Sequence, residues 1–279
     1  MAQLNGTHEK QDRYSALVLA KLRSTSVMMG LFNRKYEGSP VAGAVKIPVR
    51  DDEVKVNKDY DIKSGGELTT SKTTYKTLPI DKSLYVNELI DGYEADAVPD
   101  NLTADRLDSA GYAMGLEVDS ELINVCATSG TASTNTTALT AKTVYANIVD
   151  EVQALKKKGV HLNEMWLVVT NETFGLLCKA PEFINASDSG VKNAAEGFRG
   201  TVFGLNVYET NNIPDDSNIE YILGNNVFCH FVNEWMKKVA VNAIADGKHI
   251  GASALQGRQV YGDMISRPET VTIKKKVAA

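Results

Sequence analysis

The chain has 279 residues, of which 43% are hydrophobic and 23% are charged, with a formal net charge of -5. This composition excludes an intrinsically disordered chain, and the length suits one large domain or two interlocked ones. The charge excludes the strongly basic surface that nucleic-acid readers use, and Lys274, Lys275 and Lys276 are predicted to form a solvated tail rather than a phosphate contact.

The number of cysteines and the hydropathy of the chain indicate the cellular compartment in which it is expected. Cys126, Cys178 and Cys229 are odd in number and widely spaced, which argues against a disulfide framework or a structural zinc site. All three stand among apolar or small residues, so we predict that they are buried small hydrophobes. The N-terminal segment 1–14 has no signal-peptide core and no stretch is long and apolar enough to span a bilayer, so we expect a cytoplasmic chain.

The N-terminal region begins with a helical pattern and continues into an apolar patch. Apolar residues recur at helical spacing between Tyr14 and Leu22. The patch 28–32 reads Met-Met-Gly-Leu-Phe and lies outside any clear periodic element. We expect it to dock either on the chain's own core or on a neighbouring copy.

Residues 44–90 have the pattern of a polar two-stranded hairpin. The run 44–50 alternates between apolar and polar residues as a strand does, and Gly65-Gly66 is a turn signal. Large apolar residues are scarce between Asp51 and Thr77, whereas Lys, Asp and Thr are plentiful. Because an isolated hairpin is marginal in water, we expect this one to persist by lying across another surface.

A long helix is predicted over residues 101–127. Thr103 is a candidate cap, and Glu117, Asp119 and Glu121 do not share one helix face, so they predict a solvated charged surface rather than paired catalytic carboxylates. The apolar stripe recurs at steps of three and four residues. It consists of Leu107, Ala110, Met114, Val118, Leu122 and Val125.

The remaining elements mix helices and strands. The loop 129–137 is rich in small residues and lacks the Gly-Lys-Ser/Thr of a phosphate-binding loop, so a flexible connector is predicted. A second helix is predicted over 141–158, with Gly159 as its stop. A short helix capped by Asn171 is predicted to end near Lys179. Strands are predicted at 165–169, 205–210, 221–224, 227–229 and 271–274, which gives an α+β organisation.

Recognised catalytic and metal-binding patterns are absent from the sequence. His8, His161, His230 and His249 form no HxxxH, HExxH or HxH arrangement, and each is predicted to be an ordinary surface or core residue. The GxSxG elbow of serine hydrolases and the GxGxxG of dinucleotide-binding folds are missing as well. We therefore expect no catalytic residue, no cofactor and no metal site, and a structural role in place of an enzymatic one.

Several segments carry a resemblance when they are taken in order. The run 200–214 places a glycine-bounded turn before a strand and a closing Asn-Asn-Ile-Pro, and the run 166–173 is a strand followed by Asn-Glu-Thr. The runs 44–48 and 75–82 are the two sides of the hairpin, and 261–269 lies near the C-terminus. Together these segments resemble the major capsid proteins of tailed bacteriophages with the Hong Kong 97 fold.

This resemblance implies an α+β fold of the Hong Kong 97 type and a self-assembling icosahedral shell of hexamers and pentamers around double-stranded DNA. Its parts would be an N-terminal arm at 1–43, an extended hairpin loop at 44–90, a peripheral domain with a long spine helix at 91–159 and 251–279, and an axial domain at 160–250. Assembly contacts are expected at Met28, Leu31, Phe32, Lys63, Gly65, Gly66 and Lys72.

The resemblance also implies binding partners and a localisation. Copies of the chain would contact each other, a portal protein and, without sequence preference, the packaged DNA, in a virion capsid assembled in the host bacterial cytoplasm and without membrane contact. Some family members begin with a long cleaved scaffolding segment, for which there is no room before the N-terminal arm, so a separate scaffolding protein is expected. Two alternatives stay open: an encapsulin-like compartment shell with the same fold, and a soluble α+β enzyme with a dispersed site.

Overall fold

The fold is that of a computed structural model. It describes residues 26–35, 43–50, 54–58, 60, 62, 63, 65, 66, 68, 70, 72–92, 102–180, 198–214, 217–244 and 248–277. The helical pattern predicted between Tyr14 and Leu22 lies outside these residues. Within them, the strands form a two-stranded hairpin, a three-stranded sheet and a six-stranded sheet.

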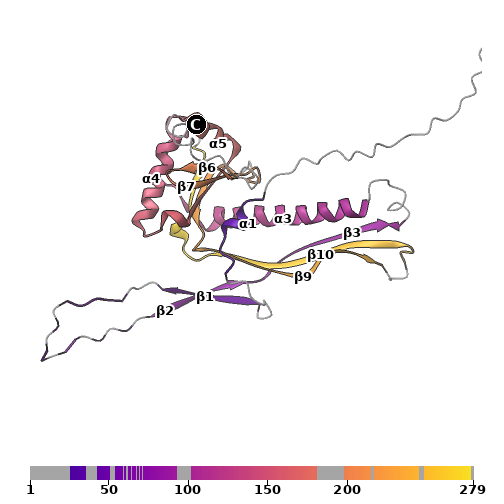
Figure 1. Cartoon of the computed structure of the whole chain (residues 1–279), viewed down its shortest axis with the longest axis horizontal. Helices are drawn as coiled ribbons and strands as arrows, with labels where there is room; N and C mark the ends of the chain where they lie inside the picture. The colour runs from indigo at the N-terminus through magenta and orange to yellow at the C-terminus, as the bar shows by residue number, and fades with distance from the viewer. Residues whose placement is uncertain are drawn as a thin grey trace, which may run out of the picture.

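The six-stranded sheet is the centre of one body of the molecule (Figure 1). Its spatial order is β4-β11-β8-β5-β7-β6, in which the pairs β5–β7 and β4–β11 are parallel and the others antiparallel. The strands are β4 (Thr131–Ala132), β5 (Met165–Val169), β6 (Phe198–Val202), β7 (Leu205–Glu209), β8 (Ile219–Asn225) and β11 (Thr272–Lys275).

This sheet is buried on both faces, which explains the uninterrupted apolar run of β5. Met165, Leu167 and Val169 share one core with the helices α4 (Val144–Lys157) and α5 (Asn171–Cys178). Trp166 and Val168 point the other way, into the core shared with the long helix α3 (Leu102–Ser129). The strand predicted at 165–169 is therefore confirmed. It lies in the middle layer, between α3 on one side and α4 and α5 on the other.

The helix α4 follows its predicted pattern, and α5 departs from it by one residue. Val144, Ile148, Val152 and Leu155 of α4 are all buried. A C-terminal stop at Gly159 is confirmed, because Gly159 has a φ of +86°, which favours glycine. In α5 the cap is Thr170 and not the predicted Asn171, since the Thr170 side chain accepts a hydrogen bond from the backbone N–H of Thr173.

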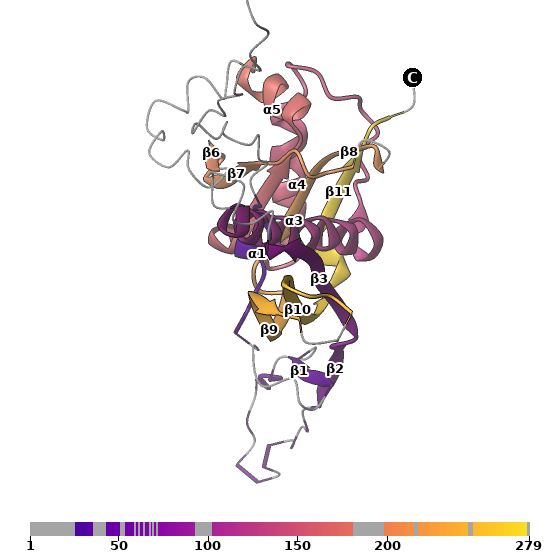
Figure 2. The ribbon, with the colours of Figure 1, turned by 90° about the vertical axis from the view of Figure 1, so that its right-hand side faces the viewer.

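The helix α3 is 28 residues long and lies along both bodies of the molecule (Figures 1 and 2). Its predicted stripe is buried from Ala110 to Leu122. Leu107, the first member of the predicted stripe, is 38% exposed, so the buried stripe begins three residues later, at Ala110. Thr103 falls inside the first turn, because the helix begins at Leu102, and it is not the cap.

The second body is a three-stranded antiparallel sheet in the order β3-β10-β9, with α3 packed on one face. Its strands are β3 (Lys82–Asp91), β9 (Cys229–Ala243) and β10 (Ala252–Ile265). The helix-facing core includes Ile90, Ala110 and Leu255. Every second residue of β3 is exposed, which is the pattern of a sheet that has one open face.

The predicted domain boundaries at 90 and 250 cut through this sheet. The range 44–90 contains most of β3, and the range 160–250 contains β9, although both strands pair with β10 in the range 251–279. The strand predicted at 227–229 is wrong, because residues 226–228 form a turn and β9 begins at Cys229. The rest of β9 and all of β10 were missed, because their middle sections carry charged and small residues in place of an apolar alternation.

The hairpin projects from the face of the three-stranded sheet that lies opposite α3 (Figure 2). Its strands β1 (Ala44–Arg50) and β2 (Thr73–Pro79) pair antiparallel, from Ala44 opposite Pro79 to Arg50 opposite Thr73. Ile47, Leu78 and Ile80 form a small core with Val232 of β9. The hairpin is thus anchored at its base by the chain's own residues.

Two predictions about single residues and one about a loop are wrong. Cys178, the last residue of α5, is exposed, whereas Cys126 and Cys229 are buried as predicted. Lys274 is not part of a solvated tail: it is buried in β11, and its Nζ donates to the backbone oxygens of Asn135 and Thr137. These bonds also hold the loop 133–137, so the segment predicted as a flexible connector is tied to β11.

The two bodies meet where β9 and β10 leave the six-stranded side, at His230. This imidazole is 3% exposed, and its Nε2 lies 3.0 Å from the Ser266 hydroxyl oxygen. The Nζ of Lys76 on β2 donates to the backbone oxygen of Ser266, which brings the hairpin into the same junction. Burial lowers the pKa of His230 to about 4.

A cavity test measures the core under α3. Replacing Leu122, which is fully buried between α3 and the six-stranded sheet, with alanine should lower the free energy of unfolding by about 2–5 kcal/mol. The same change at the half-exposed Leu107 on the same helix should cost less than about 1 kcal/mol. Urea unfolding of the unassembled chain compares the two variants, and equal losses would contradict the assigned core.

An acid test measures the junction. Between pH 6.5 and about 4, the unfolded chain binds a proton at His230 that the folded chain excludes, so stability falls as the pH falls through this window. The contribution reaches roughly 2 kcal/mol at pH 5 relative to pH 7. Urea midpoints of the unassembled chain at both pH values should show a smaller acid loss for His230→Gln than for wild type. The exposed His161→Gln is the control, and an unchanged acid loss in His230→Gln would refute the assignment.

Candidate interaction surfaces

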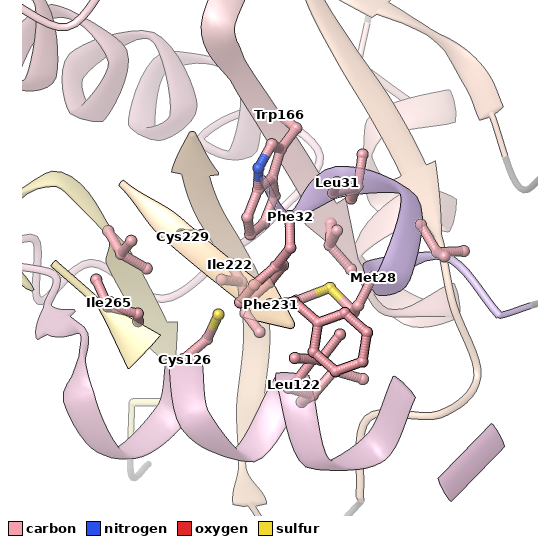
Figure 3. Close-up of a cluster of buried hydrophobic side chains, with 14 of the residues drawn as sticks. Met28, Leu31, Phe32, Leu122, Cys126, Trp166, Ile222, Cys229, Phe231 and Ile265 are labelled. Atoms are coloured by element: carbon pink, nitrogen blue, oxygen red, sulfur yellow. The ribbon is translucent and has the colours of Figure 1, made fainter. Parts of the chain in front are cut away.

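The apolar patch at residues 28–32 packs inside the chain. It contains the short helix α1 (Met28–Leu31), and Met28, Leu31 and Phe32 are all buried. Figure 3 shows Met28 and Phe32 among side chains from α3 and the six-stranded sheet, and the rings of Phe32 and Trp166 stack with centroids 6.4 Å apart. Of the two expected docking places, the chain's own core is the observed one; a further contact of this patch with a neighbour stays a prediction.

Asp119 fixes the start of this patch. Its side chain is fully buried, and its Oδ1 accepts hydrogen bonds from the backbone N–H groups of Val27 at 2.8 Å and Met28 at 2.6 Å. The Ser26 hydroxyl donates to the same oxygen at 3.0 Å, and the Asn212 amide donates to Oδ2 at 2.7 Å. The prediction of a solvated charged surface is wrong at this residue, because the carboxylate faces the sheet side of α3.

A second group of charges joins α3 to the three-stranded sheet. The Nζ of Lys82 on β3 contacts Glu121 on α3 at 2.5 Å and Asp263 on β10 at 3.0 Å. Burial acts to lower the pKa of Lys82, but hydrogen bonds to the two carboxylates outweigh it and raise that pKa. Burial raises the pKa of Asp263 despite the opposing attraction of Lys82. The sequence pattern gave no signal for this group, since its members are far apart along the chain.

The distal part of the hairpin presents apolar side chains that the described chain leaves uncovered. Ile62 is 88% exposed and Leu68 is 98% exposed. The same is true, to a lesser degree, of three more residues between the paired strands: Val54, Val56 and Tyr60. Such a group of exposed large apolar residues on one projecting segment is typical of an interaction surface.

The sequence-predicted contact residues of the hairpin lie in this same distal part. Lys63, Gly65, Gly66 and Lys72 are all exposed, beyond the last paired residues of β1 and β2. Gly65 has a φ of +74°, a backbone conformation that favours glycine and suits the predicted turn. All four residues are therefore on the surface, and their role as assembly contacts stays a prediction.

The open face of the three-stranded sheet is a second exposed surface. Tyr85 is 74% exposed and Leu89 points from the same face of β3. The Nζ of Lys237 donates to Gln256, and the Gln256 amide donates to Asn87, so a row of hydrogen bonds crosses all three strands. Tyr85, Asn87, Lys237, Gln256 and Arg258 line a shallow hollow on this face.

The described residues hold no cluster that could bind a metal ion, and two of their three thiols are buried. No three His, Cys, Asp or Glu side chains within them gather closely enough to hold a metal ion. Burial raises the pKa of Cys126 and Cys229, so both thiols stay protonated and unreactive at neutral pH. No helix in the described part of the chain is long and apolar enough to cross a membrane.

Comparison of sequences gives one family. A family model described as phage capsid protein matches residues 93–272, which is more than half of the chain. The matched range includes α3, both long strands of the second body and most of the six-stranded sheet. A comparison with curated proteins gives no match.

Comparison with solved structures finds similar folds that cover almost the whole chain. A chain of Mycobacterium phage Che8 superimposes with a TM-score of 0.77 at 21% identity, covering 99% of this chain and 100% of that one. The capsid of Cyanophage P-SCSP1u gives a TM-score of 0.74 at 12% identity, with 95% and 92% covered. The capsid of an empty GTA particle gives 0.70 at 14% identity, with 96% of each chain covered. At these identities the likeness shows a shared fold.

Proposed function

Since the chain belongs to the phage capsid protein family and is a major capsid protein that forms the shell of the virion, we propose that its copies assemble as hexamers and pentamers into an icosahedral shell around double-stranded DNA. The exposed apolar end of the hairpin carries this proposal. Ile62 and Leu68 lie on a segment that has no core of its own, and no residue in the described part of the chain covers them, which favours a contact with another copy.

The energetics favour a neighbour as that cover. Burying a large aliphatic side chain contributes about 1.5–3 kcal/mol, and the distal hairpin exposes several of them. We propose that the open face of the three-stranded sheet of an adjacent copy receives part of the hairpin, with Tyr85 and Leu89 as apolar contacts. Because the hairpin and the sheet face are different surfaces, the contact is heterologous and repeats around a ring.

We assign Hong Kong 97-type parts to the fold on this basis. Residues 1–43 are the N-terminal arm and 44–81 are the extended loop, shortened from the predicted 44–90 because β3 pairs with β10. The peripheral domain comprises α3 as the spine helix with the three-stranded sheet. The axial domain comprises the six-stranded sheet with α4 and α5, and its outer loops meet at the centre of each ring.

The same proposal includes the partners that assembly needs. A separate scaffolding protein sets the curvature, a portal protein occupies one vertex, and packaged DNA is contacted without sequence preference, which the net charge of -5 favours because strong attraction would hinder packaging. Assembly takes place in the host bacterial cytoplasm. The role is structural and not catalytic, and the family favours it over a cellular compartment shell or a soluble enzyme.

Removing the apolar end of the hairpin should abolish assembly and leave the fold intact. In the double variant Ile62→Asp and Leu68→Asp, two carboxylates would have to be buried at the contact, so shells should be lost from electron micrographs. The urea midpoint of the unassembled chain should match that of wild type, because neither side chain packs in the described core. Val277→Asp, an exposed apolar position on the other body, is the matched control. Normal shells from the double variant would refute the role of the hairpin.

The scaffolding partner gives a separate prediction. Expressed without other phage proteins, the chain should give unassembled rings or aberrant particles, because contacts between copies alone would not select one curvature. Negative-stain electron microscopy and sedimentation measure the outcome. Uniform closed shells from the chain alone would contradict the need for a scaffold while supporting the shell itself. A stable closed oligomer of a few subunits that never assembles further would contradict the shell.

A further inference from the structure

Asp119 connects three parts of the chain that are far apart in sequence. The carboxylate belongs to α3, and its hydrogen-bond donors come from residues 26–28 and from Asn212 in the loop after β7. The separations are about ninety residues in each direction along the chain. Removing this carboxylate would therefore loosen the N-terminal segment and the loop at the same time.

A charge at this place is costly unless it serves a purpose that packing alone does not. Asp119 is surrounded by the apolar core that contains Val118, Leu122 and Met28, and it is fully buried. Removing an ionised carboxylate from water is unfavourable, and only donors in fixed positions offset that cost. An apolar residue would fill the same space but would accept several positions of the N-terminal segment, whereas four directed hydrogen bonds accept one.

The other end of the segment is pinned as well. The backbone N–H of Asn33 donates to the Cys229 oxygen at 2.8 Å, and the N–H of Phe231 donates to the Asn33 oxygen at 3.1 Å. Residues 26–33 thus form a strap held by Asp119 at its start and by β9 at its end. Ser26, the first described residue, is therefore held at Asp119.

We propose that Asp119 is a positioning residue for shell assembly, which fixes the point and direction at which the N-terminal arm leaves its own subunit. This inference rests on the proposed function, and it adds that the part of the arm before Ser26 contacts a neighbouring copy. With the carboxylate in place, every subunit presents its arm at the same angle, so the contacts repeat from copy to copy. Without it, the arm leaves in several directions and the repeats lose their common angle.

Two substitutions separate the hydrogen bonds from the charge. Asp119→Ala removes the acceptor of the three donors at the start of the strap, Ser26, Val27 and Met28. Asp119→Asn keeps Oδ1 for the Val27 and Met28 N–H groups, and the Asn212 amide can rotate to offer its oxygen to the new NH₂ group. Glu117→Gln, an exposed carboxylate on the same helix, controls for the loss of a charge from α3.

Hydrogen exchange of the unassembled chain tests the strap without requiring any shell. In Asp119→Ala the Val27 and Met28 amides should exchange at least about tenfold faster, because a hydrogen bond to a charged acceptor is lost from each. The amides of β5 should stay as slow as in wild type. Asp119→Asn and Glu117→Gln should leave the strap amides close to wild type. Wild-type exchange of the strap in Asp119→Ala would overturn the proposal.

Electron microscopy of material assembled with its scaffold tests the consequence for the shell. Asp119→Ala should give open, multi-sized or irregular particles, and Asp119→Asn should restore uniform shells. Uniform shells from a variant whose strap exchanges fast would overturn the positioning role. If Asp119→Ala also speeds exchange in β5, Ser26→Ala decides, since it removes one donor of the strap and keeps the buried carboxylate: faster strap exchange with irregular particles supports the proposal, and wild-type values for both overturn it. Wild-type chain that forms no shells would refute the proposed function instead, a result that the exchange data keep apart.

Discussion

The packing of α3 against both sheets is the constraint on which the rest of the structure depends. Leu122 and Val118 meet Trp166 and Ile222 of the six-stranded sheet in one core, and further along the same helix Ala110 meets Leu255 of the three-stranded sheet. Neither sheet could bury this face without the helix. Because one rigid rod serves both, the angle between the two bodies is set by helix geometry and not by a linker.

Apolar packing sets how much surface the two bodies share, and the buried charges set where they sit. The group of Lys82, Glu121 and Asp263 joins α3 to the three-stranded sheet, and Asp119 joins the same helix to the strap. An apolar contact allows two packed elements to slide past each other, whereas a carboxylate that accepts directed hydrogen bonds does not. Both groups lie at joins between elements, where sliding would change the shape of the subunit.

The sequence predicted what depends on local periodicity and failed where pairing partners are remote. The stripes of α3 and α4 and the strand 165–169 follow from spacing alone, and the polar hairpin followed from its lack of a core. The strands β9 and β10 were missed because their backbones pair with each other while their side chains carry no alternation. Asp119 was misread for a similar reason: its donors are about ninety residues away, and no spacing rule reaches that far.

The hairpin and the strap illustrate opposite solutions to one problem. Both are short segments without a core of their own, and both carry large apolar side chains. The strap hides Met28, Leu31 and Phe32 inside its own subunit, while the hairpin leaves Ile62 and Leu68 in solvent. A subunit that buried the apolar side chains of both segments would have no surface left that favours association. A subunit that buried neither set would have no fixed shape. Burial of the strap within its own subunit gives that subunit a defined shape. Exposure of the hairpin makes association with a neighbouring subunit favourable, and a shell requires both properties.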